Sequence, residues 1–343
     1  MSVPFSGLRR LLWAALAIIL VAGLGAAAAA AWWVNQPLPL NGGAAGLSIE
    51  PGTAPRDVAQ GWVDAGVQAS PTLLYHWFRW SGKARRIRAG SYEVEPGITP
   101  QRLLDKMVQG DEAFEKVRLI EGWTFRQMRA ELARAAHLKP TSAALSDEQI
   151  MAAVGAPGVP AEGQFLPDTY VYSRGVSDLL VFKRAYSAMQ RRLVTAWAER
   201  ATDTPLKSMQ QALILASIVE KETGSAGDRG LVAGVFANRL RIGMPLQTDP
   251  TVIYGMGERF DGNLRKRDLQ ADTPFNTYTR PGMPPTPIAM PGLASLRAAV
   301  QPQPTKALYF VARGDGRSVF SDDLNAHNRA VNQYQRPKPA GNN

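Results

Sequence analysis

The chain has 343 residues, of which 45% are hydrophobic, and its basic side chains outnumber the acidic ones to give a formal charge of +10. It contains no cysteine, which excludes disulfides, thiol catalysis and cysteine metal sites. The three histidines, His76, His137 and His327, are too widely spaced for a metal motif, and no glycine-rich phosphate loop occurs. We therefore expect neither a metal nor a cofactor, and the length predicts two domains beyond any targeting segment.

The N-terminal region reads as a membrane anchor. An uncharged run over residues 11–34 follows a pair of arginines and ends with a pair of tryptophans. It is long enough to span about 30 Å of hydrocarbon. Basic residues before the span predict that residues 1–10 are cytoplasmic and that the rest of the chain lies outside the cytoplasm. A cleaved signal peptide is the alternative, but a signal core has only about 7–15 residues, so we predict a retained single-pass anchor in the inner membrane.

The positive charge indicates the kind of partner. A chain exported across a membrane does not meet nucleic acid, so we expect no nucleic-acid partner. Basic residues gather between Arg79 and Arg88. An anionic cell-wall polymer or membrane surface is the expected counter-charge.

A small strand–helix module is predicted after a linker. Residues 35–46, rich in Asn, Pro, Gly and Ala, predict the linker. Three similar segments then begin at Ser48, Tyr92 and Arg118, each with a β-prone run that ends at Gly, a Thr that can cap, and an amphipathic helix. The first two match closely, whereas recurrent turn chemistry explains the third. They predict a module over residues 47–115.

The remainder is helix-rich. We expect helices over residues 146–154, 179–201, 208–223, 230–241 and 323–334, and a hairpin formed by residues 307–312 and 318–320. A short helix has Asp249 as its predicted N-cap and Pro250 at its first position. Residues 272–292 carry six prolines and predict a long irregular stretch of the kind that usually serves function. The fold class is therefore α+β, with a helix-rich domain over residues 116–335 and a disordered tail over residues 336–343.

One predicted helix carries a carboxylate on its apolar face. At 3.6 residues per turn, Leu215, Ile218 and Glu222 share one face, and Lys221 points away from it. Apolar surroundings raise the pKa of a carboxylic acid, so Glu222 can stay protonated near neutral pH and act as a general acid. Taken alone, a glutamate in a last helical turn that bends out to water is the simpler interpretation.

The region around this helix is rich in neutral polar and aromatic groups. They are Asn238, Gln247, Tyr254, Asn276 and Tyr278. Amides and tyrosines bind sugar hydroxyls and N-acetyl groups without the desolvation cost of a charge, and aromatic faces stack on pyranose rings. Each one singly fits a loop or a cap, but as a set beside Glu222 they predict a glycan cleft.

Several runs together carry a family resemblance. They are Ala216-Ser-Ile-Val-Glu-Lys-Glu-Thr, Val235-Phe-Ala-Asn-Arg-Leu, Leu246-Gln-Thr-Asp-Pro-Thr-Val-Ile-Tyr-Gly, Asn276-Thr-Tyr, Pro287-Ile-Ala-Met-Pro-Gly and His327-Asn328. With them the chain resembles the YceG/MltG-like endolytic murein transglycosylases over residues 47–335. The resemblance implies that the first module is LysM-like and that Glu222, the second glutamate of Glu-Lys-Glu, is catalytic. Thr223 follows where other transglycosylases often have serine.

The resemblance also implies the reaction. Glu222 would protonate the glycosidic oxygen between N-acetylmuramic acid and N-acetylglucosamine, then accept the proton of the muramic C6 hydroxyl to leave a 1,6-anhydro end. The expected partners are peptidoglycan glycan strands and cell-wall synthases, and the expected role is to terminate or trim nascent strands.

Two other functions stay open. Glu162 and Asp168 could supply a second acid, which would make the chain a lysozyme-like hydrolase. Alternatively, the chain could be an anchored, non-catalytic wall-binding module, which would tolerate glutamine in place of Glu222.

Overall fold

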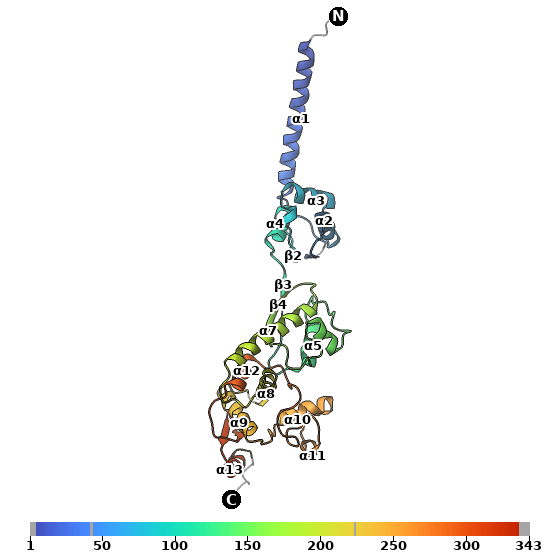
Figure 1. Cartoon of the computed structure of the whole chain (residues 1–343). Helices are drawn as coiled ribbons and strands as arrows, with labels where there is room; N and C mark the ends of the chain where they lie inside the picture. Colours follow the sequence, from blue (N-terminus) through green and yellow to red (C-terminus); the bar gives the residue numbers. More distant parts are fainter. Residues whose placement is uncertain (1–4, 42–43, 223, 336–343) are drawn as a thin grey trace, which may run out of the picture. The chain divides into compact units, whose positions relative to one another are not determined.

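The computed structural model describes residues 5–41, 44–222 and 224–335 (Figure 1). The chain divides into two compact units, one holding the residues up to Glu115 with Tyr172–Gly175 and the other Lys116–Val171 with Val176 onward. The boundary between the two units falls within β3 (Phe114–Arg118) and β4 (Thr169–Ser173), which form a two-stranded sheet. Helices and two-stranded sheets together confirm the predicted mixture of α and β structure.

The first helix, α1 (Phe5–Trp33), contains the predicted apolar span except for its last residue, Val34. Within it, Trp13–Trp33 is long and apolar enough to cross a membrane by length and composition, and its apolar side chains up to Trp32 are exposed. The helix begins inside the segment predicted to be cytoplasmic. Residues 1–4, Thr223 and the predicted tail over residues 336–343 lie outside the described residues.

The first unit is a small strand–helix module. Strand β1 (Ala45–Ile49) pairs antiparallel with β2 (Gly90–Val94), Ala45 lying opposite Val94 and Ile49 opposite Gly90. The other elements of the module are α2 (Pro55–Asp64), α3 (Pro71–Trp80), a 3₁₀ turn (Ala84–Arg86) and α4 (Pro100–Gln109). Each α-helix begins with proline at its first position, where the missing N–H costs nothing. The core between helices and strands contains Trp62, Phe78, Tyr92, Leu103 and Met107.

The segment predicted to be a linker packs against this module. Leu38 is buried, and its N–H donates to Ile98 O at 2.7 Å. The carbonyl of Pro39 accepts from Gln68 N at 2.8 Å. Backbone hydrogen bonds of this kind fix the chain, so residues 35–41 belong to the module and are not a free connection.

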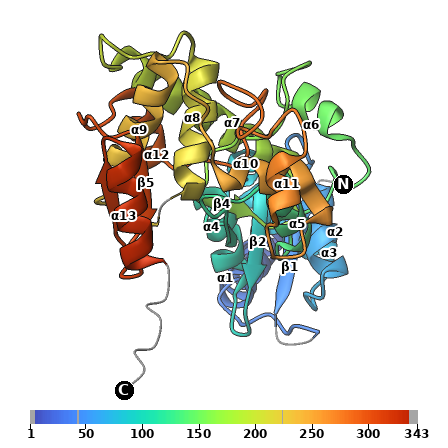
Figure 2. The ribbon, with the colours of Figure 1, turned by 90° about the horizontal axis from the view of Figure 1, so that it is seen from below.

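The second unit is mostly helical. Its α-helices are α5 (Phe125–Arg134), α6 (Asp147–Ala153), α7 (Asp178–Ala198), α8 (Met209–Glu222), α9 (Arg229–Arg241), α10 (Asp249–Met256), α11 (Lys266–Gln270), α12 (Leu293–Val300) and α13 (Leu324–Tyr334). A 3₁₀ turn (Gly257–Arg259) follows α10. Strands β5 (Tyr309–Ala312) and β6 (Ser318–Ser321) form the predicted antiparallel hairpin, against which α13 lies (Figure 2).

The five long predicted helices of this unit are confirmed, with ends that differ by up to three residues. Helices α11 and α12 and strand β4 were not expected. The N-cap of α10 was predicted one residue late, since Thr248 is the N-cap and Asp249 is already helical. The Thr248 side chain makes no cap hydrogen bond because its hydroxyl is bound to Glu222.

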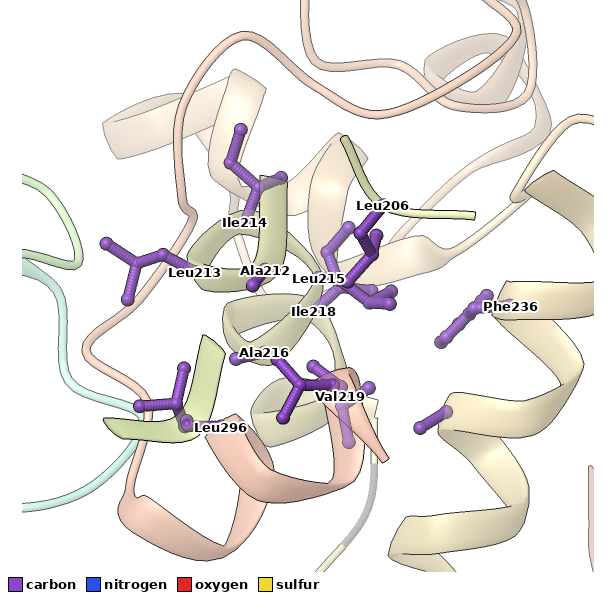
Figure 3. Close-up of a cluster of buried hydrophobic side chains, with 14 of the residues drawn as sticks. Leu206, Ala212, Leu213, Ile214, Leu215, Ala216, Ile218, Val219, Phe236 and Leu296 are labelled. Atoms are coloured by element: carbon purple, nitrogen blue, oxygen red, sulfur yellow. The ribbon is translucent and has the colours of Figure 1, made fainter. Parts of the chain in front are cut away.

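Helix α8 forms the centre of the core of this unit. Every side chain from Ala212 to Val219 is buried, so the predicted apolar face extends around the whole helix over two turns. Phe236 of α9 and Leu296 of α12 pack against it, and Figure 3 shows α8 side chains pointing toward Phe236. Such dense packing on all sides holds the axis of α8 in place.

The proline-rich stretch lies along α8 without regular structure, as predicted. Ile288 N donates to the buried Ser217 Oγ at 3.0 Å, and Gly292 N donates to Glu220 Oε2 at 2.8 Å. These bonds satisfy backbone groups that have no partner in a helix or sheet. The stretch is therefore fixed to the helix that carries Glu222.

Two truncations test where the first unit begins. Val34 is buried and its carbonyl accepts from Gln101 N at 3.1 Å, while Trp33 packs against the core of the module. We expect a chain that starts at Trp33 to fold without detergent. A chain that starts at Asn35 should melt about 2–6 °C lower, because it loses the buried Val34, the partly buried Trp33 and one hydrogen bond. Thermal unfolding of both would check this, and equal midpoints would contradict the packing of Trp33 and Val34.

Candidate active site

A cavity of about 550 Å³ opens at the C-terminal end of α8, a size common for small-molecule sites. It is lined by Glu222, Arg239, Leu246, Gln247, Asp249, Tyr278, Tyr309, Phe310, Val311, Ala312, Ser318, Leu324, His327, Asn328, Val331 and Gln335. All of these residues belong to the second unit. One wall is formed by the start of α10 and Tyr278, and the other by the β5–β6 hairpin and α13.

Glu222 ends α8 at this cavity, and its carboxyl oxygen Oε1 accepts from Thr248 Oγ1. Burial raises the pKa of Glu222 to about 7; the negative Asp249 adds to the rise, while the Thr248 hydrogen bond and Arg239 act against it. The helix dipole also disfavours a negative charge at a C-terminal end. The carboxyl group is therefore divided between its protonated and ionised forms near neutral pH.

Thr248, the hydrogen-bond partner of Glu222, is held in place by two other buried threonines. Thr248 N donates to Thr277 Oγ1 at 3.1 Å, and Thr251 Oγ1 donates to Thr248 O at 2.7 Å. The Thr251 and Thr277 hydroxyls lie 2.9 Å apart. Because all three side chains are buried, the Thr248 hydroxyl has a fixed position from which to orient the carboxyl group.

Arg239 connects the two walls of the cavity. Its Nε donates to Leu308 O at 2.7 Å beside β5, and its Nη1 donates to Leu246 O at 2.8 Å before α10. Its guanidinium carbon lies 5.2 Å from the centre of the Tyr309 ring, within cation–π range. The planar fork of arginine suits such a junction, since lysine would supply only a point charge.

Two predicted ligands share the cavity with Glu222. Tyr278 donates through its hydroxyl to Asp249 Oδ1 at 2.6 Å. Gln247 is exposed and has a positive φ of 50°, a backbone conformation that few residues other than glycine adopt. Its N–H donates to Thr277 O at 3.1 Å, which holds the backbone while the side chain lines the cavity.

Asn276 does not line the cavity. It is fully buried, and its amide donates to Leu269 O at 3.0 Å and Ala271 O at 2.7 Å. Its Oδ1 accepts from Tyr278 N at 2.8 Å. These bonds favour a positioning role, in which Asn276 holds Tyr278, over direct contact with a ligand.

Asn238 is also engaged by the protein backbone. Its amide donates to Thr305 O at 2.9 Å and to Ala307 O at 3.0 Å, and its oxygen accepts from Arg241. The geometry therefore favours a role for Asn238 in fixing the segment before β5.

Tyr254 pairs with a second buried carboxyl group. Its hydroxyl donates to Glu162 Oε2 at 3.1 Å, and its ring meets Phe275 edge-on with ring centres 4.9 Å apart. Phe125 N donates to Glu162 Oε1 at 3.0 Å. Burial raises the pKa of Glu162 to about 7. Neither Tyr254 nor Glu162 is among the described residues that line the cavity.

The second carboxylate that lines the cavity is Asp249, which the sequence had indicated only as a helix cap. Asp168, the other candidate acid, accepts from its neighbour Thr169 N at 2.7 Å. Asp249, Thr248 and Arg239 all fall within the runs that carried the family resemblance, so a signal for them was present. Among the described residues, no cluster of three or more His, Asp or Glu side chains could hold a metal ion.

Comparison with known proteins identifies the class. Residues 47–333 match the profile of the YceG-like family. The chain belongs to this family. The crystal structure of a yceG-like protein from Listeria monocytogenes is similar, with a TM-score of 0.54 and 28% identity, over 83% of this chain and 98% of that one.

Curated relatives carry the name endolytic murein transglycosylase. The Bacillus subtilis protein of that name is 30% identical over 305 residues, which is 84% of each chain. The Streptococcus pneumoniae protein is 25% identical over 299 residues, 78% of this chain and 54% of its own length.

The raised pKa of Glu222 predicts that stability depends on pH. In the folded protein the pKa of Glu222 is about 7, above the ordinary value of 4.5. The contribution of protonated Glu222 to the free energy of unfolding is therefore fully present below pH 4.5 and is lost as pH rises through 7. Glu222→Gln cannot ionise, and we expect it to be more stable than the wild type at pH 8 by about 1–3 kcal/mol. Chemical denaturation at pH 8 and pH 4.5 measures the difference. If the wild type and Glu222→Gln were equally stable at pH 8, the carboxyl group of Glu222 would have to be solvated.

Asn276 is predicted to matter for stability. Asn276→Ala removes a fully buried amide with its hydrogen bonds to Leu269 O, Ala271 O and Tyr278 N, and should cost about 2–4 kcal/mol of unfolding free energy. Gln247→Ala is the control, because its exposed side chain should contribute less than about 0.5 kcal/mol. Denaturant unfolding of the two variants separates these values, and a neutral Asn276→Ala would argue against the positioning role.

Proposed function

We propose that this protein is a membrane-anchored peptidoglycan lytic transglycosylase with Glu222 as its single acid and base. The observation that carries the proposal is a carboxyl group with a pKa of about 7 at the end of a cavity large enough for sugar units. Family membership and the name shared by its curated relatives support the same reaction.

The reaction begins with protonated Glu222. It donates its proton to the glycosidic oxygen between N-acetylmuramic acid and N-acetylglucosamine, and the bond from that oxygen to the muramic C1 breaks. Carboxylate Glu222 then accepts the proton of the muramic C6 hydroxyl, whose oxygen bonds to C1. The products are a new N-acetylglucosamine 4-hydroxyl end and a 1,6-anhydro-muramic end, with no water consumed.

The surroundings of Glu222 suit both of its roles. A pKa near 7 makes neither protonation state costly at neutral pH, which is the condition for efficient general acid–base catalysis. Burial and Asp249 favour the protonated form before the bond breaks. The Thr248 hydroxyl and the positive Arg239 then stabilise the carboxylate that results.

The substrate contacts follow from the cavity. Tyr278 and Gln247 line it and are proposed to bind sugar groups directly. Asn238, Tyr254 and Asn276 remain proposed members of the site, and their hydrogen bonds support indirect roles through the segments that they hold.

The first unit and the anchor would place this chemistry at the membrane. We propose that α1 is retained in the inner membrane with residues 1–10 in the cytoplasm, and that residues 47–115 form a LysM-like module that contacts glycan. The proposed role is termination or trimming of nascent strands at this membrane, with cell-wall synthases as proposed partners.

Asp249 is the strongest observation in favour of the alternative function, a lysozyme-like hydrolase. A lysozyme-like enzyme needs a second carboxylate to activate water or to attack the sugar, and Asp249 lines the same cavity as Glu222. The hydroxyl of Tyr278 already occupies one Asp249 oxygen, which favours a role in tuning Glu222. The ends of the products separate these functions, because a hydrolase leaves reducing ends.

The test is product analysis with a matched pair of variants. Wild-type protein incubated with purified glycan strands should give internal cuts with anhydro ends by mass spectrometry. Glu222→Gln should lose about 10³–10⁴-fold in rate, since one group serves as acid and base. Glu220→Gln, on the far side of the helix, should retain most of the activity. Reducing ends would favour the hydrolase, and an active Glu222→Gln protein would contradict the assignment of Glu222.

The pH dependence supplies a second test. If protonated Glu222 starts the reaction, kcat/KM should fall as pH rises through about 7. The negative Asp249 raises the pKa of Glu222, so Asp249→Asn should move this midpoint to lower pH. Glu258→Gln, which removes an exposed carboxylate of the same unit, is the control and should leave it unchanged. A midpoint that stays in place or rises in Asp249→Asn would contradict the coupling.

A further inference from the structure

His327 lies in the cavity wall that the proposed reaction does not use. It belongs to α13 and lines the same cavity as Glu222. Its ring stacks on Tyr309, with ring centres 5.1 Å apart and planes 25° apart. Tyr309 in turn lies beneath the guanidinium of Arg239. The face of the imidazole is therefore in contact with Tyr309, and its two nitrogen atoms, at the edge of the ring, are not used in this contact.

The Nδ1 atom of His327 is buried and has no hydrogen-bond partner among the described residues. Most buried polar side-chain atoms in proteins do have one. The atom belongs to a ring that stacks on Tyr309 and lines the cavity, where a ligand could supply the missing partner. Of the described residues with such an unpaired atom, His327 is the one that lines this cavity.

The surroundings keep the imidazole neutral. Burial lowers the pKa of His327, and the positive Arg239 lowers it further. The other charged or titratable groups that line the cavity are Glu222, Asp249, Tyr278 and Tyr309, and the lining from α13 near His327 includes the apolar Leu324. A neutral imidazole carries one donor and one acceptor, which suits an uncharged amide or hydroxyl better than an anion.

We propose that His327 is a substrate-binding residue whose Nδ1 hydrogen-bonds the N-acetyl group of a sugar unit bound beside the scissile bond. This inference rests on the proposed function and names the group that the α13 wall recognises. An N-acetyl amide offers both a donor and an acceptor, so it pairs with either tautomer of the imidazole. Its methyl group fits the apolar part of the same wall, which includes Val311 and Leu324.

Three variants of the full chain in detergent test the inference. His327→Asn places a polar amide where Nδ1 lies. His327→Leu introduces a side chain of about the same size and shape as asparagine but without polar atoms. His327→Phe keeps the ring that stacks on Tyr309 but has no nitrogen. Each is combined with Glu222→Gln so that binding is measured without cleavage. His137→Leu, at an exposed histidine of the second unit that does not line the cavity, is the control.

Binding is measured on purified glycan strands before and after chemical removal of their N-acetyl groups. His327→Leu and His327→Phe should bind N-acetylated strands about 3–10-fold more weakly, as expected for one hydrogen bond, and His327→Asn should recover most of this loss. On N-deacetylated strands the three variants should bind alike. With Glu222 present, the loss should be seen in KM more than in kcat.

The outcomes separate this inference from the proposed function. Equal binding of His327→Leu and His327→Asn to N-acetylated strands would overturn the inference even where anhydro products form. The same loss on N-deacetylated strands would also overturn it, because the contact would not be to the N-acetyl group. Binding that depends on His327 without any anhydro product would support the inference and contradict the transglycosylase. If His327→Phe folds poorly, the Asn and Leu pair decides.

Discussion

The burial of one carboxyl group at the end of a fully packed helix is the constraint on which the site depends. Side chains from Ala212 to Val219 are buried around α8, so this helix cannot rotate to move Glu222 into water without exposing its core. The cost of burying a charge then falls on the ionised form of Glu222, and its pKa rises to about 7. The hydrophobic core and the proposed chemistry are thus two consequences of the same packing.

The elements around Glu222 serve to keep its surroundings constant. Arg239 bonds to the backbone on both sides of the cavity, and the buried threonines fix the hydroxyl that meets the carboxyl group. The irregular proline-rich stretch is held to α8 through Ser217 and Glu220. Preorganised polar groups of this kind need no rearrangement as charge moves during a reaction. The two glutamates of Glu-Lys-Glu accordingly have different tasks, Glu220 holding a loop and Glu222 facing the cavity.

Much of this could be predicted from the sequence, because it depends on local patterns. Helix spacing predicted the long helices of the second unit, and it put Glu222 on an apolar face. The choice among neutral polar residues could not be made in that way, since only the fold decides that Asn276 is buried and that Tyr278 lines the cavity. Asp249 looked like a helix cap because Asp-Pro is typical of one, yet Thr248 takes that position. The packing of Leu38 was hidden by the linker-like composition around it.

The central claim is that Glu222 is protonated for a large part of the time at neutral pH. Carbon-13 NMR of the side-chain carboxyl groups in glutamate-labelled protein measures this directly, with Glu222→Gln and Glu162→Gln spectra to assign the two buried residues. We predict that the resonance lost in Glu222→Gln titrates with a midpoint near pH 7. A midpoint near 4.5, the ordinary value for glutamate, would contradict the account, because Glu222 would then be an ionised surface group with no proton to give.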